Sequence, residues 1–265
     1  MDNIALGRYL PLDSWMHRID PRFKIVGMLL MLVSIFIPSG WVGYGLLVVV
    51  VIIALAISKI PLNYIVKSFK PMLFMMTFLL VINILVIRTG RVLIDLGWFK
   101  VYSNALSQTA YIGIRLLLMI IVTTILTATT KPLDMTLGIE DLLKPLKRFG
   151  VPAHEIAMMI SIALRFIPTL IDETTRIMKA QSSRGVDFQE SSIKERVMGI
   201  LSLIVPLFVS AFQRAEDLAD AMEARGYSPG RPRTRYKQLK IMPHDYVFLT
   251  SCVVVLASII GLSVL

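Results

Sequence analysis

Two arginine–glycine pairs stand out among the residues that could take part in chemistry or binding. Ser183-Arg184-Gly185 ends one long stretch with helical periodicity, and Ala224-Arg225-Gly226 ends a second stretch about forty residues later. Arginine keeps its charge and offers a planar fork of donors to carboxylates and backbone carbonyls. Two helices that end in this way could enter grooves on two similar partner subunits.

An arginine–glycine helix end also has a purely structural explanation. Glycine commonly follows the C-terminus of a helix, and the helix dipole favours arginine near the last turn. A single such end is therefore weak evidence for binding, whereas two matched ends on two long helices favour a docking role. The candidate docking residues are Ser183, Arg184, Gly185, Ala224, Arg225 and Gly226.

Motifs for catalysis are missing from the sequence. It contains no GxxxxGK[ST] loop for nucleotide phosphates, no GxSxG motif and no HExxH pair. His17, His154 and His244 are widely scattered, and packing near the membrane surface explains each better than metal binding. We therefore expect no cofactor, no metal and no enzymatic activity. Energy for any transport would have to come from another subunit.

The composition predicts an integral membrane protein. Of 265 residues, 55% are hydrophobic and only 17% are charged, whereas soluble domains carry more charge. The net charge of +10 lies mostly between or beside the apolar runs. This pattern is typical of the positively charged cytoplasmic loops of membrane proteins rather than of a nucleic-acid-binding surface. The single cysteine, Cys252, excludes an internal disulfide.

We expect about five membrane spans, because a spanning helix needs about 20 mostly apolar residues. The candidate spans run approximately from Ile25 to Ile37, Val42 to Ile57, Met72 to Ile87, Leu106 to Thr129 and Tyr246 to Leu265. Most flanking lysines and arginines fall on one side if the N-terminus is cytoplasmic. Arg115 lies within the fourth run, and we expect its side chain to reach towards the membrane surface.

The segment of residues 131–240 has a different character. After a short amphipathic stretch, two helical stretches run from about Ala153 to Ser183 and from about Ile193 to Ala224, and both begin apolar and end charged. Each would be about 45 Å long. Pro168 and Pro206 predict kinks that would let the two helices bend and cross.

The predicted fold is thus an all-α integral membrane protein with three parts. Residues 1–130 would form an N-terminal membrane domain of about four spans. Residues 131–240 would form a cytoplasmic coupling domain of long crossed helices, and residues 241–265 a C-terminal transmembrane helix. The protein would lie in the bacterial plasma membrane and cross it several times.

The chain resembles the transmembrane T component of energy-coupling factor transporters, the EcfT/CbiQ-like family, over essentially its whole length. The similar segments are Asp20-Pro21-Arg22-Phe23-Lys24, Ala163-Leu164-Arg165-Phe166-Ile167-Pro168, Met222-Glu223-Ala224-Arg225-Gly226-Tyr227 and Arg233-Thr234-Arg235-Tyr236. The first helix end has Ser-Arg-Gly where many members have Ala-Arg-Gly, so a small residue is kept.

The resemblance implies a coupling subunit of an ATP-driven importer. Such a subunit would join two ATP-binding-cassette ATPases to a small membrane-embedded S component that binds a vitamin or a metal ion. Arg184 and Arg225 would each dock in a groove of one ATPase, and ATP binding and hydrolysis would make the S component topple. The resemblance favours the shared, vitamin-type systems over the dedicated cobalt or nickel systems.

Two other functions remain open from the residues alone. A self-contained secondary transporter would need coordinating groups near the membrane midplane, where these spans carry few ionisable residues. An integral membrane enzyme acting on lipids could use Asp134, Glu140 and Asp141, although their spacing is more typical of a solvated helix face.

Overall fold

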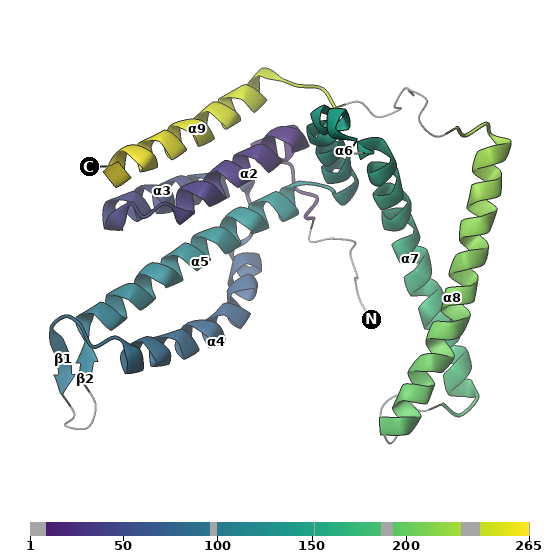
Figure 1. Cartoon of the computed structure of the whole chain (residues 1–265), viewed down its shortest axis with the longest axis horizontal. Coiled ribbons are helices and arrows are strands. Elements are labelled where there is room, and N and C mark those ends of the chain that lie inside the picture. The colour runs from purple at the N-terminus through teal and green to yellow at the C-terminus, as the bar shows by residue number, and fades with distance from the viewer. Residues whose placement is uncertain (1–8, 96–99, 151, 187–192, 229–238, 265) are drawn as a thin grey trace. The chain divides into compact units, whose positions relative to one another are not determined.

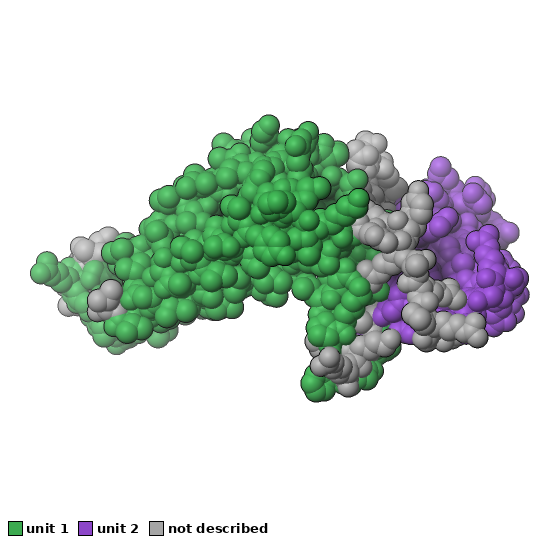
Figure 2. Space-filling model, turned by 90° about the horizontal axis from the view of Figure 1, so that it is seen from above, with its two compact units in different colours: residues 1–153, 239–265 green, residues 154–238 purple. Residues whose placement is uncertain are grey.

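The computed structural model describes residues 9–95, 100–150, 152–186, 193–228 and 239–264 (Figure 1). The chain divides into two compact units, and each is described by itself (Figure 2). Unit 1 comprises Met1–Ala153 and Leu239–Leu265, and unit 2 comprises His154–Gln238. Both units are built from helices, which confirms the predicted all-α fold class.

Unit 1 contains most of the helices. They are α1 (Trp15–Arg18), α2 (Pro21–Phe36), α3 (Gly40–Ser58), α4 (Leu62–Val86), α5 (Ser103–Thr129), α6 (Pro132–Leu143), the short 3-10 helix η1 (Lys144–Phe149) and α9 (Pro243–Val264). Helices α3, α4 and α5 contain the second, third and fourth apolar runs, and they begin two to ten residues earlier than the sequence suggested.

A short β-ribbon connects α4 and α5. Strand β1 (Val92–Asp95) pairs antiparallel with β2 (Lys100–Tyr102), with Val92 opposite Tyr102 and an irregularity between Val92 and Ile94. The sequence analysis predicted no strand here. The ribbon follows from the β-branched and aromatic residues of both strands, which favour extended backbone, but segments of three and four residues give too little signal to predict.

Several helices are long and apolar enough to cross a membrane. In the described part of the chain, length and composition select α3, α5, α9 and most of the two helices of unit 2. Helix α4 qualifies as a bent pair, Leu62–Lys70 and Met72–Val86, with a bend of 48° between the two parts. Helix α2, which holds the first apolar run, has 16 residues and falls below the length required.

The core of unit 1 lies where α2, α3, α5 and α9 meet. Ile35, Leu47, Leu118 and Ile259, one from each helix, are almost completely buried. Helix α2 packs closely along α9 because Gly27 has no side chain to keep the helices apart. A Cβ atom at Gly27 would lie 2.5 Å from Phe248 Cε1, too close for a normal contact.

The start of α2 explains why Asp20, Pro21 and Arg22 occur together. Asp20 caps the helix, since its Oδ1 accepts a hydrogen bond from the Arg22 amide at 2.9 Å. Pro21 occupies the first helical position, where its missing amide costs nothing. The Arg22 guanidinium folds back onto the Asp20 carboxylate, with Nε 3.1 Å from Oδ1 and Nη2 3.2 Å from Oδ2.

The same segment joins four parts of unit 1. The buried Asp245 of α9 accepts a hydrogen bond from the Asp20 amide at 2.9 Å. Arg22 also forms an ion pair with Asp141 of α6 at 3.4 Å and donates to the carbonyl of Leu239 at 3.1 Å. Phe23 packs edge-on against Tyr246, with ring centroids 5.4 Å apart. These contacts hold α2, α6 and α9 together.

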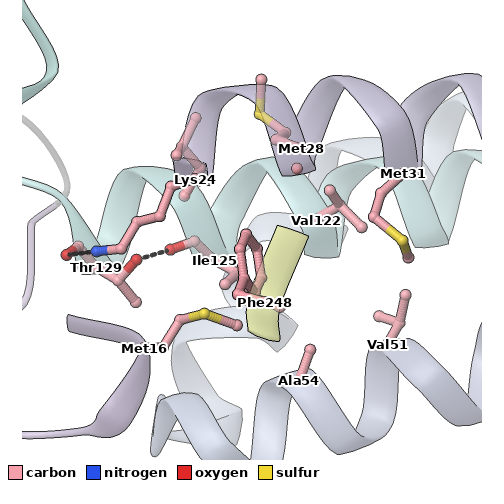
Figure 3. A pocket seen from close by; sticks show the side chains of 12 residues that line it. Met16, Lys24, Met28, Met31, Val51, Ala54, Val122, Ile125, Thr129 and Phe248 are labelled. Carbon is pink, nitrogen blue, oxygen red and sulfur yellow. Dashed lines mark hydrogen bonds between the residues drawn. The ribbon is translucent and has the colours of Figure 1, made fainter. Parts of the chain in front are cut away.

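Lys24 completes this junction at the end of α5. Its Nζ is buried and donates to the carbonyls of Thr129 at 3.0 Å and His17 at 3.5 Å. Its stem lines an apolar pocket of about 60 Å³ among α2, α3, α5 and α9, together with side chains such as Met31 and Phe248 (Figure 3). Lys24 therefore supplies a donor to the Thr129 carbonyl at the C-terminus of α5, where the helix itself leaves carbonyls without partners.

His17 fixes the N-terminal segment beside this junction. Its Nε2 lies 3.0 Å from the Leu10 carbonyl, which can only accept, so Nε2 carries the proton and Nδ1 accepts from the Ser14 hydroxyl at 2.6 Å. Burial lowers the pKa of the His17 imidazole below its usual value, which favours this neutral form. The segment also bonds to α5 directly, through the Leu10 amide and the Ala128 carbonyl at 2.9 Å.

Candidate docking site at two arginine-ended helices

Unit 2 consists of two long helices with the bounds that the sequence predicts. Helix α7 spans Ala153–Ser183 and helix α8 spans Ile193–Ala224. Both continue as α-helix through their internal prolines, Pro168 and Pro206. The two candidate docking segments therefore lie at the C-terminal ends of helices of 31 and 32 residues.

Helix α7 ends in a Schellman motif. Gly185 adopts a φ of +89°, in the left-handed region that glycine enters without steric cost. Its amide donates to the Ser182 carbonyl at 3.0 Å, and the Val186 amide donates to the Gln181 carbonyl at 3.1 Å. These are the two hydrogen bonds that define the motif, and they reverse the chain immediately after Arg184.

Helix α8 ends in the same motif at equivalent positions. Gly226 has a φ of +72°, its amide donates to the Glu223 carbonyl at 2.8 Å, and the Tyr227 amide donates to the Met222 carbonyl at 2.9 Å. Arg225 thus occupies the place that Arg184 occupies on α7, the last residue before the left-handed glycine. The similarity of the two ends extends from sequence to backbone geometry.

Both arginine side chains are exposed. Within the described residues, neither guanidinium has a hydrogen-bond or ion-pair partner. By contrast, Arg176, an exposed arginine about two turns earlier on α7, lies 3.8 Å from the carboxylate of Glu173. As far as the described residues go, the Arg184 and Arg225 guanidinium groups therefore keep their donors available for an external acceptor.

The two helices meet close to the end of α7. The Gln181 side-chain amide donates to the Ser202 carbonyl of α8 at 3.4 Å, and α7 and α8 cross near this end in Figure 1. The sequence predicts long crossed helices, and this contact lies at the crossing. Because Gln181 also accepts the closing hydrogen bond of the Schellman motif, the Arg184 end is linked to the body of α8.

Helix α8 carries a long apolar surface that the sequence analysis did not assign to the site. This surface lies on the segment Met198–Phe212, in the apolar first part of the helix. In the structure, many of its large apolar side chains are exposed. They are Met198, Ile200, Leu201, Ile204, Val205, Phe208, Val209 and Phe212. Exposed apolar surface of this length marks a site that contacts lipid or another protein.

Other residues singled out in the sequence lie elsewhere. Arg165, within the Ala163–Pro168 segment, is exposed on α7, and Arg233-Thr234-Arg235-Tyr236 lies outside the described residues. Asp141 of α6 is engaged by Arg22 and by Lys144, whose Nζ lies 2.7 Å away, and Glu140 is buried. Structural ion pairing thus accounts for Asp141, which the hypothesis of a lipid enzyme would use as a catalytic group.

These features define a class of protein. The chain is a helical membrane protein with several candidate spans and a second unit in which two long helices end in identical arginine-bearing caps. The family described as cobalt transport protein (CbiQ) matches residues 13–236. Three similar proteins, each named energy-coupling factor transporter transmembrane protein EcfT, come from different bacteria.

The protein from Bacillus subtilis is 44% identical over 97% of both chains. Those from Macrococcus caseolyticus and Lactococcus lactis are 43% and 42% identical, each over 96% of both chains. The chain therefore belongs to the EcfT family and is the transmembrane component of an energy-coupling factor transporter, as the resemblance predicted.

Proposed function

We propose that this protein couples ATP hydrolysis in two partner ATPases to the movement of a small substrate-binding S component during vitamin or metal-ion uptake. In this proposal the chain is a scaffold that itself catalyses no reaction. Arg184 and Arg225, with the small residues beside them, each enter a groove on one ATPase. The cytoplasmic coupling domain comprises α7 and α8, and the N-terminus is also cytoplasmic.

The equivalence of the two helix ends carries this proposal. Two ATPases of similar fold would present similar grooves. The parts of this chain that bind in those grooves should then also be similar to each other. Here both elements have an exposed guanidinium, a left-handed glycine and the same two backbone hydrogen bonds. A helix with a fixed end can transmit a push along its axis, because its backbone hydrogen bonds resist compression.

The apolar surface of α8 supports the second part of the proposal. A subunit embedded in the membrane offers an apolar face, and the exposed side chains of Met198–Phe212 provide a matching one. Phe208 and Phe212 lie one turn apart with ring centroids 4.6 Å from each other. Methionine and aromatic side chains suit a surface that accepts several partners in turn.

The test is affinity purification of the full chain from its native membranes in mild detergent. We expect the wild-type protein to retain two nucleotide-binding subunits and a small hydrophobic subunit, and the complex to hydrolyse ATP. Arg184→Ala with Arg225→Ala should leave the chain in the membrane but release both ATPases. Losing a hydrogen-bonded charge at an interface costs about 2–5 kcal/mol, at least a thirtyfold loss of affinity.

Arg176→Ala is the matched control, because Arg176 is exposed on the same helix but lies away from its end. It should leave the complex intact. Each single variant, Arg184→Ala or Arg225→Ala, should weaken the binding of one ATPase only. Full retention of both ATPases by the double variant would contradict docking through these ends. Ion-driven transport by the purified chain alone would favour a secondary transporter.

A further inference from the structure

Arg115 is a charged residue in the middle of a membrane-type helix. It is the thirteenth of the 27 residues of α5, since this helix begins at Ser103 rather than near Leu106. A charge on an apolar helix is costly unless it is paired or reaches the membrane surface, and it marks a functional position by default. The sequence analysis expected its side chain to reach towards the membrane surface and assigned it no ligand.

The Arg115 guanidinium lies in a cluster of aromatic rings from three helices. Its Cζ atom is 5.9 Å from the ring centroid of Phe36, 6.0 Å from that of Tyr44 and 5.5 Å from that of Tyr111. Trp41 extends the cluster, with its ring 5.8 Å from that of Tyr111. Aromatic faces attract a cation and make its burial less costly, but they do not neutralise its charge.

One hydrogen bond fixes the direction of the guanidinium. Arg115 Nε donates to the Tyr44 hydroxyl at 2.8 Å, and this buried hydroxyl donates to the Ile35 carbonyl at 2.8 Å. Among the described residues, the terminal nitrogens Nη1 and Nη2 have no acceptor, and the side chain is only half-buried. None of the described residues therefore occupies the edge of the guanidinium that binds an anion in bidentate fashion.

No carboxylate of the surrounding helices can pair with Arg115. The sequence has no aspartate or glutamate at residues 21–94, 96–133 or 246–265. Asp245, the one acidic residue of α9, lies in its first turn and is bound to the Asp20 amide at the start of α2. Arg115 instead contacts Phe36, the last residue of α2, and thus lies at the opposite end of that helix.

The position of the cluster indicates which anion is available there. Phe36 and Trp41 flank the turn between α2 and α3, and both are exposed. Tryptophan and tyrosine concentrate at the level of lipid headgroups, where one part of the ring meets lipid and the other meets water. At this level the phosphate of a phospholipid is the abundant anion that fits a guanidinium fork.

We propose that Arg115, held by Phe36, Tyr44 and Tyr111, binds the phosphate group of a phospholipid in the leaflet beside the α2–α3 turn. The site would take the phosphate in bidentate fashion through Nη1 and Nη2. It would serve zwitterionic and anionic phospholipids alike, because both carry this group. A carboxylate from a partner membrane subunit is the competing occupant, and the position among exposed aromatic residues at a helix turn favours the lipid.

The experiment compares lipids that differ in the phosphate. The purified full chain in detergent is supplemented with phosphatidylglycerol, phosphatidylcholine or a galactosyl diacylglycerol, all with the same acyl chains. Thermal unfolding and native mass spectrometry measure stabilisation and retained lipid. We expect both phospholipids to raise the Tm more than the galactolipid does. Arg115→Gln should abolish this difference and reduce phospholipid retention about tenfold or more, the factor for one lost charge-assisted hydrogen bond.

Arg88→Gln is the matched control, because Arg88 is an exposed arginine just beyond α4. It should respond to phospholipid as the wild-type protein does. Arg115→Lys keeps the charge without the planar fork, so it should fold and still lose most of the phospholipid preference. It therefore provides the test if Arg115→Gln fails to fold.

Three results would overturn the proposal. One is an equal response to phospholipid in the wild-type, Arg115→Gln and Arg115→Lys proteins. A second is a rise in Tm with inorganic phosphate as large as that with phospholipid, which would assign the site to the free anion. The third is an unchanged lipid response together with loss of a co-purifying membrane subunit in the Arg115 variants. That result would show that the Arg115 guanidinium binds a carboxylate of the partner subunit.

Discussion

The amide of Asp20 donates a hydrogen bond to Oδ1 of Asp245 at 2.9 Å, across 225 positions of the sequence. The second carboxylate oxygen of Asp245 accepts from the Met242 amide at 2.6 Å. One buried side chain therefore fixes the N-terminal ends of both α2 and α9. Arg22 and Lys24 add bonds to α6 and α5 at the same place, so the first turns of two apolar helices share one polar junction.

We predict that Asp245→Ala destabilises the membrane unit by about 2–4 kcal/mol. The substitution leaves the buried Asp20 amide and the partly buried Met242 amide without their charged acceptor. Thermal or denaturant unfolding of the purified full chain in detergent measures the loss. Asp13→Ala is the control, because Asp13 pairs with Arg18 at the surface, where such pairs add little. Equal stability of the Asp245 variant and the control would contradict the role assigned to Asp245.

The glycines after the two proposed docking arginines should be sensitive to replacement by alanine. Gly185 and Gly226 have positive φ angles, which cost a residue with a side chain about 1–2 kcal/mol. Cβ atoms at these glycines would meet no other atom, so backbone conformation alone causes the loss. In the purification assay, Gly185→Ala with Gly226→Ala should weaken ATPase binding although both arginines remain, because the caps that hold them are distorted.

Gly45→Ala is the control for this pair. Gly45 lies within α3 at ordinary helical φ, also with open space around its Cα, and alanine there should stabilise the helix by about 0.5–1 kcal/mol. It should leave ATPase binding unchanged. Wild-type binding by the double glycine variant would show that the arginines act without the caps.

Single cysteines should report the orientation of the chain. Cys252 is buried, so the background labelling by a membrane-impermeant maleimide should be low. Thr89→Cys, in the exposed stretch between α4 and β1, should react in intact cells. Asp13→Cys and Glu223→Cys, both exposed positions, should react only after permeabilisation. Labelling of Asp13→Cys from outside would contradict the cytoplasmic N-terminus.

The helices that position the docking ends are predictable from the sequence. The bounds of α7 and α8 follow from helical periodicity interrupted by Arg-Gly, a local signal that the Schellman motif then realises in the backbone. The apolar runs likewise identify α3, α5 and α9, because length and composition are properties of a continuous segment.

The contacts that the sequence did not predict are those between distant segments. The residues next to Asp20 in the sequence do not indicate that its partner is Asp245. In the same way, the residues next to Arg115 do not indicate that it bonds to Tyr44. Their pairing depends on how α2, α3, α5 and α9 pack, which the separate periodicity of each helix leaves undetermined. The β-ribbon was missed for another reason, since its strands are too short for periodicity to be visible.

The Asp20–Asp245 bond also constrains the order of folding during synthesis. Helix α2 leaves the ribosome early, whereas α9 is made more than two hundred residues later. It is α9 that packs over Gly27 and contains Asp245, the acceptor of the hydrogen bond from the Asp20 amide. The face of α2 that packs against α9 in unit 1 therefore stays uncovered while α7 and α8 are being translated. The last helix closes a bundle that the second helix began, so α7 and α8 are present before that bundle is complete.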